Sequence, residues 1–346
     1  MAIADTPFTG KIREELLDRR SRLEDVLSHN ESEQMQRLLD DVDHALERMN
    51  IGKFGLCEVC HDTIEAGRLL NDPTISVCLG CLSPAQQRSL EHDLELAAQI
   101  QRGLLPPPNV EIAGWDIAYH YRPAGVVSGD YCDLIGSGDG GLHFLIADVA
   151  GKGIAAALLS TNLRAVFRTL IPLGLSMEEM LAQASRLFCD NTLPTQYATL
   201  VAGRVSPAGE LEIVNAGHLP VLLTGPRGTR VFESTDLPFG MFCDQHYTAK
   251  KARLEPGDTL VLYTDGISEA QNQAGEEYGA AAIKSLIESR EPGCPGDLIR
   301  NCRERLDGFR GGQERTDDET LLAIQYLPAK SAIEYASSAV AQSSAS

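Results

Sequence analysis

Two closely spaced pairs of cysteines lie in the first third of the sequence. Cys57 and Cys60 form one Cys-x-x-Cys pair, and Cys78 and Cys81 form a second pair 17 residues further on. Each pair makes a small turn that directs two thiolates at one ion, and two such turns complete a tetrahedral cage that suits zinc. Because four thiolates leave no position open for water, we expect one structural Zn²⁺ without catalytic chemistry.

A second group of candidate residues consists of aspartates next to apolar, strand-like segments. The aspartates are Asp130, Asp148, Asp265, Asp317 and Asp318, and the apolar segments beside the last four are 143–147, 259–264 and 321–326. A carboxylate at the rim of a buried strand is costly unless it is hydrated, paired or bound to metal. One such residue alone is more often a turn residue, but four sites of this kind predict convergence on one location.

Carboxylates gathered in this way would repel one another and become partly protonated without cations. Two divalent cations would cancel that repulsion, and hard oxygen ligands favour Mg²⁺ or Mn²⁺. Two such ions can lower the pKa of a shared water toward neutrality and neutralise phosphoryl oxygens. The pattern therefore predicts a metal-dependent phosphatase in which an activated hydroxide attacks phosphorus in line.

The elements that would position these groups follow from helical spacing. Two apolar stripes fall within residues 7–50, separated by the polar segment 28–34, where Asn30 and Glu33 predict a capping box. They indicate an antiparallel helical hairpin, or alternatively a solvated spacer or dimer contact. Ser83, Pro84 and Gln86 predict the start of another helix, which ends near Leu105 before a run of prolines.

We expect five parts along the chain: a helical hairpin over 1–50, a zinc finger over 51–82, a linker helix over 83–108, an α+β domain over 109–328 and a disordered tail over 329–346. A helix is also predicted over 154–170, directly after the glycine-rich turn at 151–153.

The composition narrows the class of protein. The 346 residues include 43% hydrophobic residues, and the net charge is -19. This balance argues against broad binding to nucleic acid or anionic membranes, since both require basic surface. No apolar run approaches a membrane-spanning length, so we expect a soluble, cytoplasmic protein. In that reducing compartment we expect no disulfides, and the remaining cysteines, Cys132, Cys189, Cys243, Cys294 and Cys302, are interpreted as buried thiols.

The region around the cysteine pairs resembles the DksA/TraR-type zinc finger. The resemblance rests on residues 49–57, on Arg68 and Leu69, and on Pro73 and Thr74 before Cys78. Members of that family carry a helical hairpin and bind RNA polymerase rather than DNA. The hairpin here is much shorter than in the long members, and its tip offers only Glu31 and Glu33. The finger is therefore interpreted as a sensory or docking module, with RNA polymerase as one partner and no direct binding to DNA.

The rest of the chain resembles the PPM-type, or protein phosphatase 2C-like, serine/threonine phosphatases of the bacterial SpoIIE/RsbU branch. The resemblance rests on residues 95–101, 104–106, 121–124, 128–130, 148–153, 215–218, 264–266 and 317–320. It implies a central β-sandwich flanked by helices, with a two-metal site at one edge. Carried over position by position, the implied metal ligands are Asp130, Asp148, Asp265 and Asp317, with the carbonyl of Val149 as a further ligand. Asp318 is the alternative to Asp317, and Asp133 is a weaker candidate.

Two positions depart from eukaryotic relatives. The histidine proposed there as a general acid is replaced by Ala150, and Arg122 is only near the place of the phosphate-binding arginine. A surface ion pair is the alternative interpretation of Arg122, and a hydrogen-bonded structural residue is the alternative interpretation of His218.

The resemblance implies a protein-serine/threonine phosphatase that uses two Mn²⁺ or Mg²⁺ ions. Its implied substrates are phosphorylated anti-sigma factor antagonists, which would place it in bacterial partner switching, and its linker helix is implied to form a homodimer contact. The alternative is a transcription regulator that binds RNA polymerase through the finger and hairpin and uses an inactive phosphatase-like domain as a scaffold.

Overall fold

The structure of the protein is a computed structural model that describes residues 7–29, 32–107, 110, 112–193, 195–289 and 293–328. The chain forms two compact units, Met1–Asp93 and Leu94–Ser346. We call them the amino-terminal and the carboxy-terminal unit and describe each by itself. The predicted tail, residues 329–346, lies outside the described residues.

The amino-terminal unit is built on two helices, α1 (Pro7–His29) and α2 (Glu33–Asn50). They pack through apolar residues that share one face of each helix, including Ile12 and Leu16 of α1 and Val42 and Leu46 of α2. The predicted hairpin is thus present. The N-cap of α2 is Ser32, without a side-chain hydrogen bond, so the expected capping box is wrong; Asn30 itself lies outside the described residues.

The cysteine segment folds against this helix pair. It contains the short helix α3 (Ala66–Asn71) and the 3-10 turn η1 (Leu79–Cys81). The buried Arg48 of α2 donates hydrogen bonds to the carbonyl groups of Ile75, Lys53 and Leu56. One guanidinium therefore binds carbonyls on both sides of the first cysteine pair and ties the cysteine segment to α2.

Helix α4 (Pro84–Leu104) spans the boundary between the two units. The Ser83 hydroxyl accepts from the amide of Gln86, and the Gln86 side chain accepts from the amide of Ser83. This reciprocal cap confirms the predicted helix start, and the helix ends just before Pro106, as expected from the proline run.

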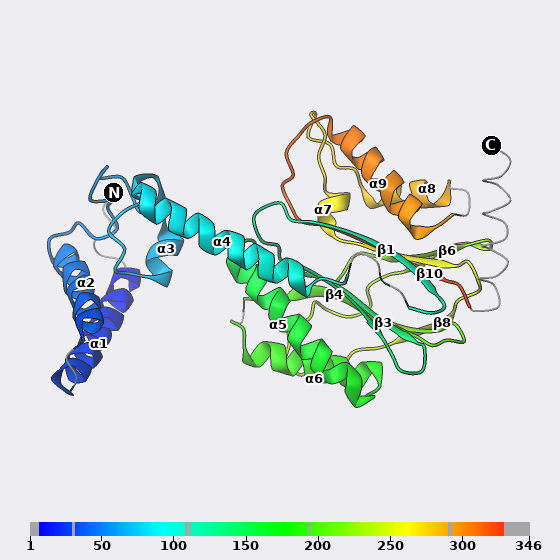
Figure 1. The fold of residues 1–346 in the computed structure, drawn as a ribbon, viewed down its shortest axis with the longest axis horizontal. Coiled ribbons are helices and arrows are strands. Elements are labelled where there is room, and N and C mark those ends of the chain that lie inside the picture. The colour runs from blue at the N-terminus through cyan, green and yellow to red at the C-terminus, as the bar shows by residue number, and fades with distance from the viewer. Residues whose placement is uncertain are drawn as a thin grey trace. The chain divides into compact units, whose positions relative to one another are not determined.

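The carboxy-terminal unit contains two five-stranded antiparallel sheets (Figure 1). The first sheet has the order β1-β10-β9-β6-β7 and the second has the order β2-β3-β4-β5-β8. The strands are β1 (Trp115–Arg122), β2 (Asp130–Gly136), β3 (Leu142–Val149), β4 (Ala198–Val205), β5 (Glu210–Ala216), β6 (Val221–Gly225), β7 (Gly228–Phe232), β8 (Lys250–Arg253), β9 (Thr259–Tyr263) and β10 (Glu319–Tyr326).

Helices cover the outer faces of both sheets, as Figure 1 shows. Helices α5 (Ile154–Leu170) and α6 (Met177–Asp190), joined by η2 (Ile171–Leu173), pack on the second sheet. Helices α7 (Asp265–Ser268), α8 (Ala280–Glu288) and α9 (Pro295–Arg310) lie against the first. A third apolar cluster fills the space between the sheets and includes Phe144, Val201 and Leu322. The predicted α+β sandwich flanked by helices is confirmed.

The segment Ile154–Leu173 is long and apolar enough to cross a membrane by length and composition alone. It corresponds to α5 and η2, and its Leu163 and Phe167 are fully buried in the cluster against the second sheet. The expectation that no apolar segment approaches that length is therefore wrong, while the packing is that of a core helix.

The cysteines outside the zinc finger differ from the expectation in two ways. The structure joins Cys189, near the end of α6, to Cys243 in a disulfide with a Cα–Cα distance of 5.7 Å. Their separation of 54 residues gave no signal in the sequence. Cys294 is exposed, and only Cys132 and Cys302 are the buried thiols that we predicted.

Candidate active site and metal centres

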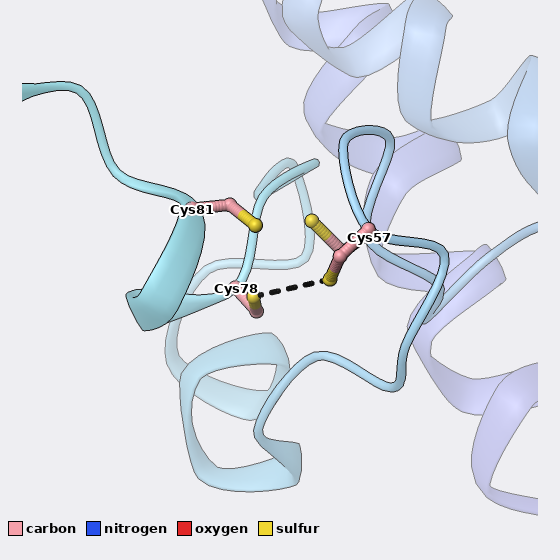
Figure 2. A group of neighbouring side chains, drawn as sticks. Cys57, Cys78 and Cys81 are labelled. Carbon is pink, nitrogen blue, oxygen red and sulfur yellow. Dashed lines mark hydrogen bonds between the residues drawn. The ribbon is translucent and has the colours of Figure 1, made fainter.

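The four cysteines form a compact cluster in the amino-terminal unit. Their sulfur atoms all lie within 4.8 Å of one another, and the sulfurs of Cys60 and Cys78 are 3.7 Å apart. Figure 2 shows the side chains of Cys57, Cys78 and Cys81 pointing into a common space. The predicted ligand set is therefore assembled by two local turns.

Ionisation of these thiols is strongly interdependent. Hydrogen bonds from the backbone at Cys60 and Cys78 lower the pKa of Cys57 to about 6. Hydrogen bonding with the thiols of Cys60 and Cys78 raises the pKa of Cys81 to about 12. Opposite shifts within one cluster mean that four thiolates need a cation to coexist, and tetrahedral sulfur ligands suit zinc.

The acidic group lies in the carboxy-terminal unit and begins with a cross-strand pair. Asp130, at the start of β2, is directly opposite Asp148, near the end of β3. Asp130 is buried, and one of its carboxylate oxygens accepts hydrogen bonds from the hydroxyls of Thr264 at 2.9 Å and Thr320 at 2.5 Å. Thr264 follows β9 and Thr320 lies within β10 of the other sheet, so the Asp130 carboxylate links the two sheets.

The Asp318 carboxylate is held in place by two backbone amides. Its two oxygens accept from the amides of Ala124 and Gly129, each at 2.8 Å. Gly129 packs tightly, because a Cβ there would lie 3.2 Å from the carbonyl oxygen of Val149. This contact places the Val149 carbonyl, the predicted backbone ligand, beside the segment that leads into Asp130.

Asp265 begins α7 directly after β9 and is brought to Asp317 and Asp318 by a close backbone approach. A Cβ on Gly266 would collide with the carbonyl of Asp318. Glycine at 266 is thus required for α7 to start beside the entry to β10. Asp317 forms an ion pair with Lys152, whose Nζ lies 2.7 Å from its carboxylate and 2.7 Å from the carbonyl oxygen of Thr316.

The negative charges of these aspartates act on one another, and the side chains are called the acidic locus below. Burial and then the charges of Asp265, Asp317 and Asp318 raise the pKa of Asp148 to about 7. Burial and the neighbouring Asp148 hold the pKa of Asp130 well above its usual value, and burial and Asp317 raise the pKa of Asp265. The carboxylates are more widely spaced than the thiols: within the described part of the chain, only the four cysteines bring three or more ligand atoms within 4.8 Å.

The donors of this locus fit divalent cations. All of its side-chain ligands are hard carboxylate oxygens, and the raised pKa values of Asp130, Asp148 and Asp265 report negative charge that burial leaves uncompensated. Mg²⁺ or Mn²⁺ would stabilise the ionised forms, and the chemistry of the donors favours these ions over zinc.

Three further sequence candidates receive structural explanations. Asp133 is fully buried and forms a bidentate ion pair with Arg168, at 2.6 and 2.7 Å. This ion pair explains the buried charge of Asp133 without a metal ion.

His218 is buried; its Nε2 donates to the carbonyl of Tyr263 and its Nδ1 accepts from the hydroxyl of Thr199. Burial lowers the pKa of His218 to about 4, so the ring is neutral and structural. Arg122 is exposed at the end of β1.

Sequence reasoning missed the residues that hold the ligands in place. Thr264 directly precedes Asp265, and Thr320 lies two residues after Asp318. Their places in the motifs 264–266 and 317–320 were the available signal. Gln101 of α4 ends the motif 95–101, which did not reveal its role. Its buried amide donates to the carbonyl of Ser128 at 2.7 Å and accepts from the amide of Ser128 at 3.0 Å. The Ser128 hydroxyl then accepts from the amide of Asp130.

The fold and the acidic locus define a class of protein that the family comparison also finds. Residues 138–327 match the family described as Stage II sporulation protein E (SpoIIE), and residues 52–87 match the prokaryotic dksA/traR C4-type zinc finger. The chain belongs to the SpoIIE family and carries a zinc finger of the dksA/traR type, which confirms both resemblances.

Particular relatives support this assignment. The chain is 27% identical to Protein IcfG of Synechocystis, and this match covers 67% of the chain described here. It is 25% identical to phosphoserine phosphatase RsbU of Bacillus subtilis, and that match covers 69% of the chain described here. It spans only 41% of the length of IcfG but 71% of RsbU. The solved SiaA-PP2C domain of Pseudomonas aeruginosa superposes on 70% of this chain and 98% of its own, with a TM-score of 0.61 at 20% identity, which shows a shared fold.

Proposed function

We propose that the carboxy-terminal unit is a metal-dependent protein-serine/threonine phosphatase. The observation that carries this proposal is the convergence of Asp130, Asp148, Asp265, Asp317 and Asp318 from both sheets on one electrostatically coupled locus. Membership in the SpoIIE family and the similarity to a phosphoserine phosphatase support it.

The aspartates and the Val149 carbonyl would hold two Mn²⁺ or Mg²⁺ ions. When bound, such ions supply an activated water and neutralise charge on phosphoryl oxygens. The residues of this chain supply the positions: Thr264 and Thr320 fix the Asp130 carboxylate, and the amides of Ala124 and Gly129 fix Asp318. Ala150 carries no acid, so we expect water to protonate the leaving serine oxygen.

The proposed substrates are phosphoserine proteins of the anti-sigma factor antagonist class, which act in partner switching of bacterial sigma factors. This part of the proposal rests on the similarity to the RsbU branch. The proposed site of action is the cytoplasm, where such substrates are found.

The proposal is tested by Mn²⁺-dependent release of phosphate from a phosphoserine protein. We expect Asp265→Asn to reduce kcat by about 10³-fold, since loss of a metal ligand removes several kcal/mol of transition-state stabilisation. Asp139→Asn is the matched control, because Asp139 is exposed in the turn between β2 and β3, and it should retain activity. Full activity of Asp265→Asn would refute the two-metal site. The same variant, used to trap phosphoproteins from cells, would identify the substrate.

The amino-terminal unit is proposed to dock a protein partner, with RNA polymerase as the first candidate. The support is the family match at residues 52–87 and the folding of the finger onto the hairpin through Arg48. Polymerase should co-purify with the full chain and not with Cys57→Ser. Equal recovery with both proteins would exclude docking through the finger.

A further inference from the structure

Lys152 is the basic side chain that contacts the acidic locus. Its ammonium lies 2.7 Å from a carboxylate oxygen of Asp317, and it favours the ionised forms of Asp148 and Asp265. A cation at this point offsets part of the negative charge that five aspartates bring together. It also forms an ion pair with the carboxylate of Asp317, which is one of the predicted metal ligands.

Lys152 lies between two glycines at the start of α5, and most of its side chain is exposed. The flanking Gly151 and Gly153 both have positive φ angles, 105° and 75°, and Gly153 is the N-cap of α5. Two-thirds of the Lys152 side chain is exposed, and its recorded partners are the Asp317 carboxylate and the Thr316 carbonyl. Neither contact buries the ammonium, so it can exchange one anionic partner for another.

We propose that Lys152 is a phosphate-binding residue of this site, held at Asp317 until the substrate phosphoryl group takes over its ammonium. The proposal rests on the phosphatase function proposed above and adds a residue to it. Lysine binds phosphate as a mobile point charge, and such charge-assisted hydrogen bonds are among the stronger contacts in proteins. Ala150 offers no such group, and in the described part of the chain Arg122 forms no ion pair or hydrogen bond with these carboxylates.

This exchange predicts two effects of opposite sign for Lys152→Met. Without its ammonium, the carboxylates lose a competitor, so Mn²⁺ measured without substrate should bind about three- to tenfold more tightly. Inorganic phosphate should bind the Mn²⁺-loaded protein about ten- to a hundredfold more weakly, because a charge-assisted hydrogen bond is lost. A purely structural role would not move the two affinities in opposite directions.

Isothermal titration of the full chain, first with Mn²⁺ and then with inorganic phosphate, measures both quantities without turnover. Lys152→Arg should retain most of the phosphate affinity, and Lys284→Met, which removes an exposed lysine on α8, should change neither. Unchanged phosphate affinity in Lys152→Met, or a loss of both affinities together, would overturn the proposal. Failure of the wild-type protein to hydrolyse phosphoproteins while these shifts are present would count against the proposed function and not against the role of Lys152.

Discussion

The thiol cluster and the acidic locus are both candidate metal centres, and they are assembled in different ways. The four cysteines lie within one short segment, and two local turns bring their sulfurs within 4.8 Å. The aspartates come from β2, β3, the start of α7 and the entry to β10, and they meet only when two sheets stack. We therefore expect the folding of the cysteine segment to depend on its ion, whereas the aspartates are brought together by a fold with its own apolar core.

The largest expected effect separates the two sites by their dependence on metal. Cys57→Ser or zinc removal should unfold the cysteine segment, because zinc binding supplies folding free energy comparable with the stability of a whole small domain. The carboxy-terminal unit, which has its own apolar core, should keep its melting transition. Circular dichroism and zinc analysis would measure this, with Cys294→Ser as the control. A cysteine segment that stays folded without zinc would contradict the comparison.

A second prediction distinguishes a carboxylate neutralised by arginine from carboxylates that need metal. Arg168→Met leaves the charge of Asp133 buried without its main partner and should destabilise the carboxy-terminal unit by about 3–5 kcal/mol. Mn²⁺ affinity of the folded protein should not change. Arg186→Met, on the exposed face of α6, is the matched control for denaturant unfolding. A loss of Mn²⁺ affinity without loss of stability would place Asp133 in the metal site after all.

The difference between the two sites also explains what the sequence could reveal. The cysteine spacing predicted the four-cysteine cluster, because both turns are local. The aspartates were predicted as a group, from their places next to strands β3, β9 and β10. The pairing of Asp130 with Asp148 depends on sheet register, and the role of Gln101 depends on a contact 27 residues along the chain. The Cys189–Cys243 disulfide was missed for the same reason, since only the packed loop after β7 brings the two thiols together.

A smaller effect is expected where α4 supports the acidic locus. Gln101→Ala leaves both backbone groups of Ser128 without their partner, and a buried unpaired group costs about 1–3 kcal/mol. The segment that leads into Asp130 should loosen, and Mn²⁺ should bind several-fold more weakly. Gln99→Ala, two residues earlier on an exposed position of the same helix, is the control. Equal Mn²⁺ affinities for the two variants would show that α4 does not position the ligands.

A last prediction is a pH dependence in the acid range, which the acidic locus should show when divalent cations are absent. The pKa of Asp148 is about 7 in the folded protein against an ordinary value of 3.8, so the native state binds more protons than the unfolded chain between these values. Without divalent cations, the stability of the carboxy-terminal unit should fall as the pH rises through this window. Each kcal/mol lost from the free energy of unfolding should lower Tm by about 2–4 °C. Added Mn²⁺ should reverse the trend, because it binds the ionised carboxylates. Asp148→Asn should keep only the part of the trend that Asp130 and Asp265 contribute. A pH-independent Tm, or a trend of undiminished size in Asp148→Asn, would contradict this assignment.

Direct Mn²⁺ titration of the zinc-loaded chain, followed by electron paramagnetic resonance, tests the central claim that the aspartates form a metal site. We predict that the wild-type protein takes up two Mn²⁺ ions, that Asp148→Asn loses this binding while it keeps its zinc, and that Asp139→Asn behaves as wild type. Equal Mn²⁺ uptake by wild type and Asp148→Asn, or no uptake by the wild-type protein, would contradict the account.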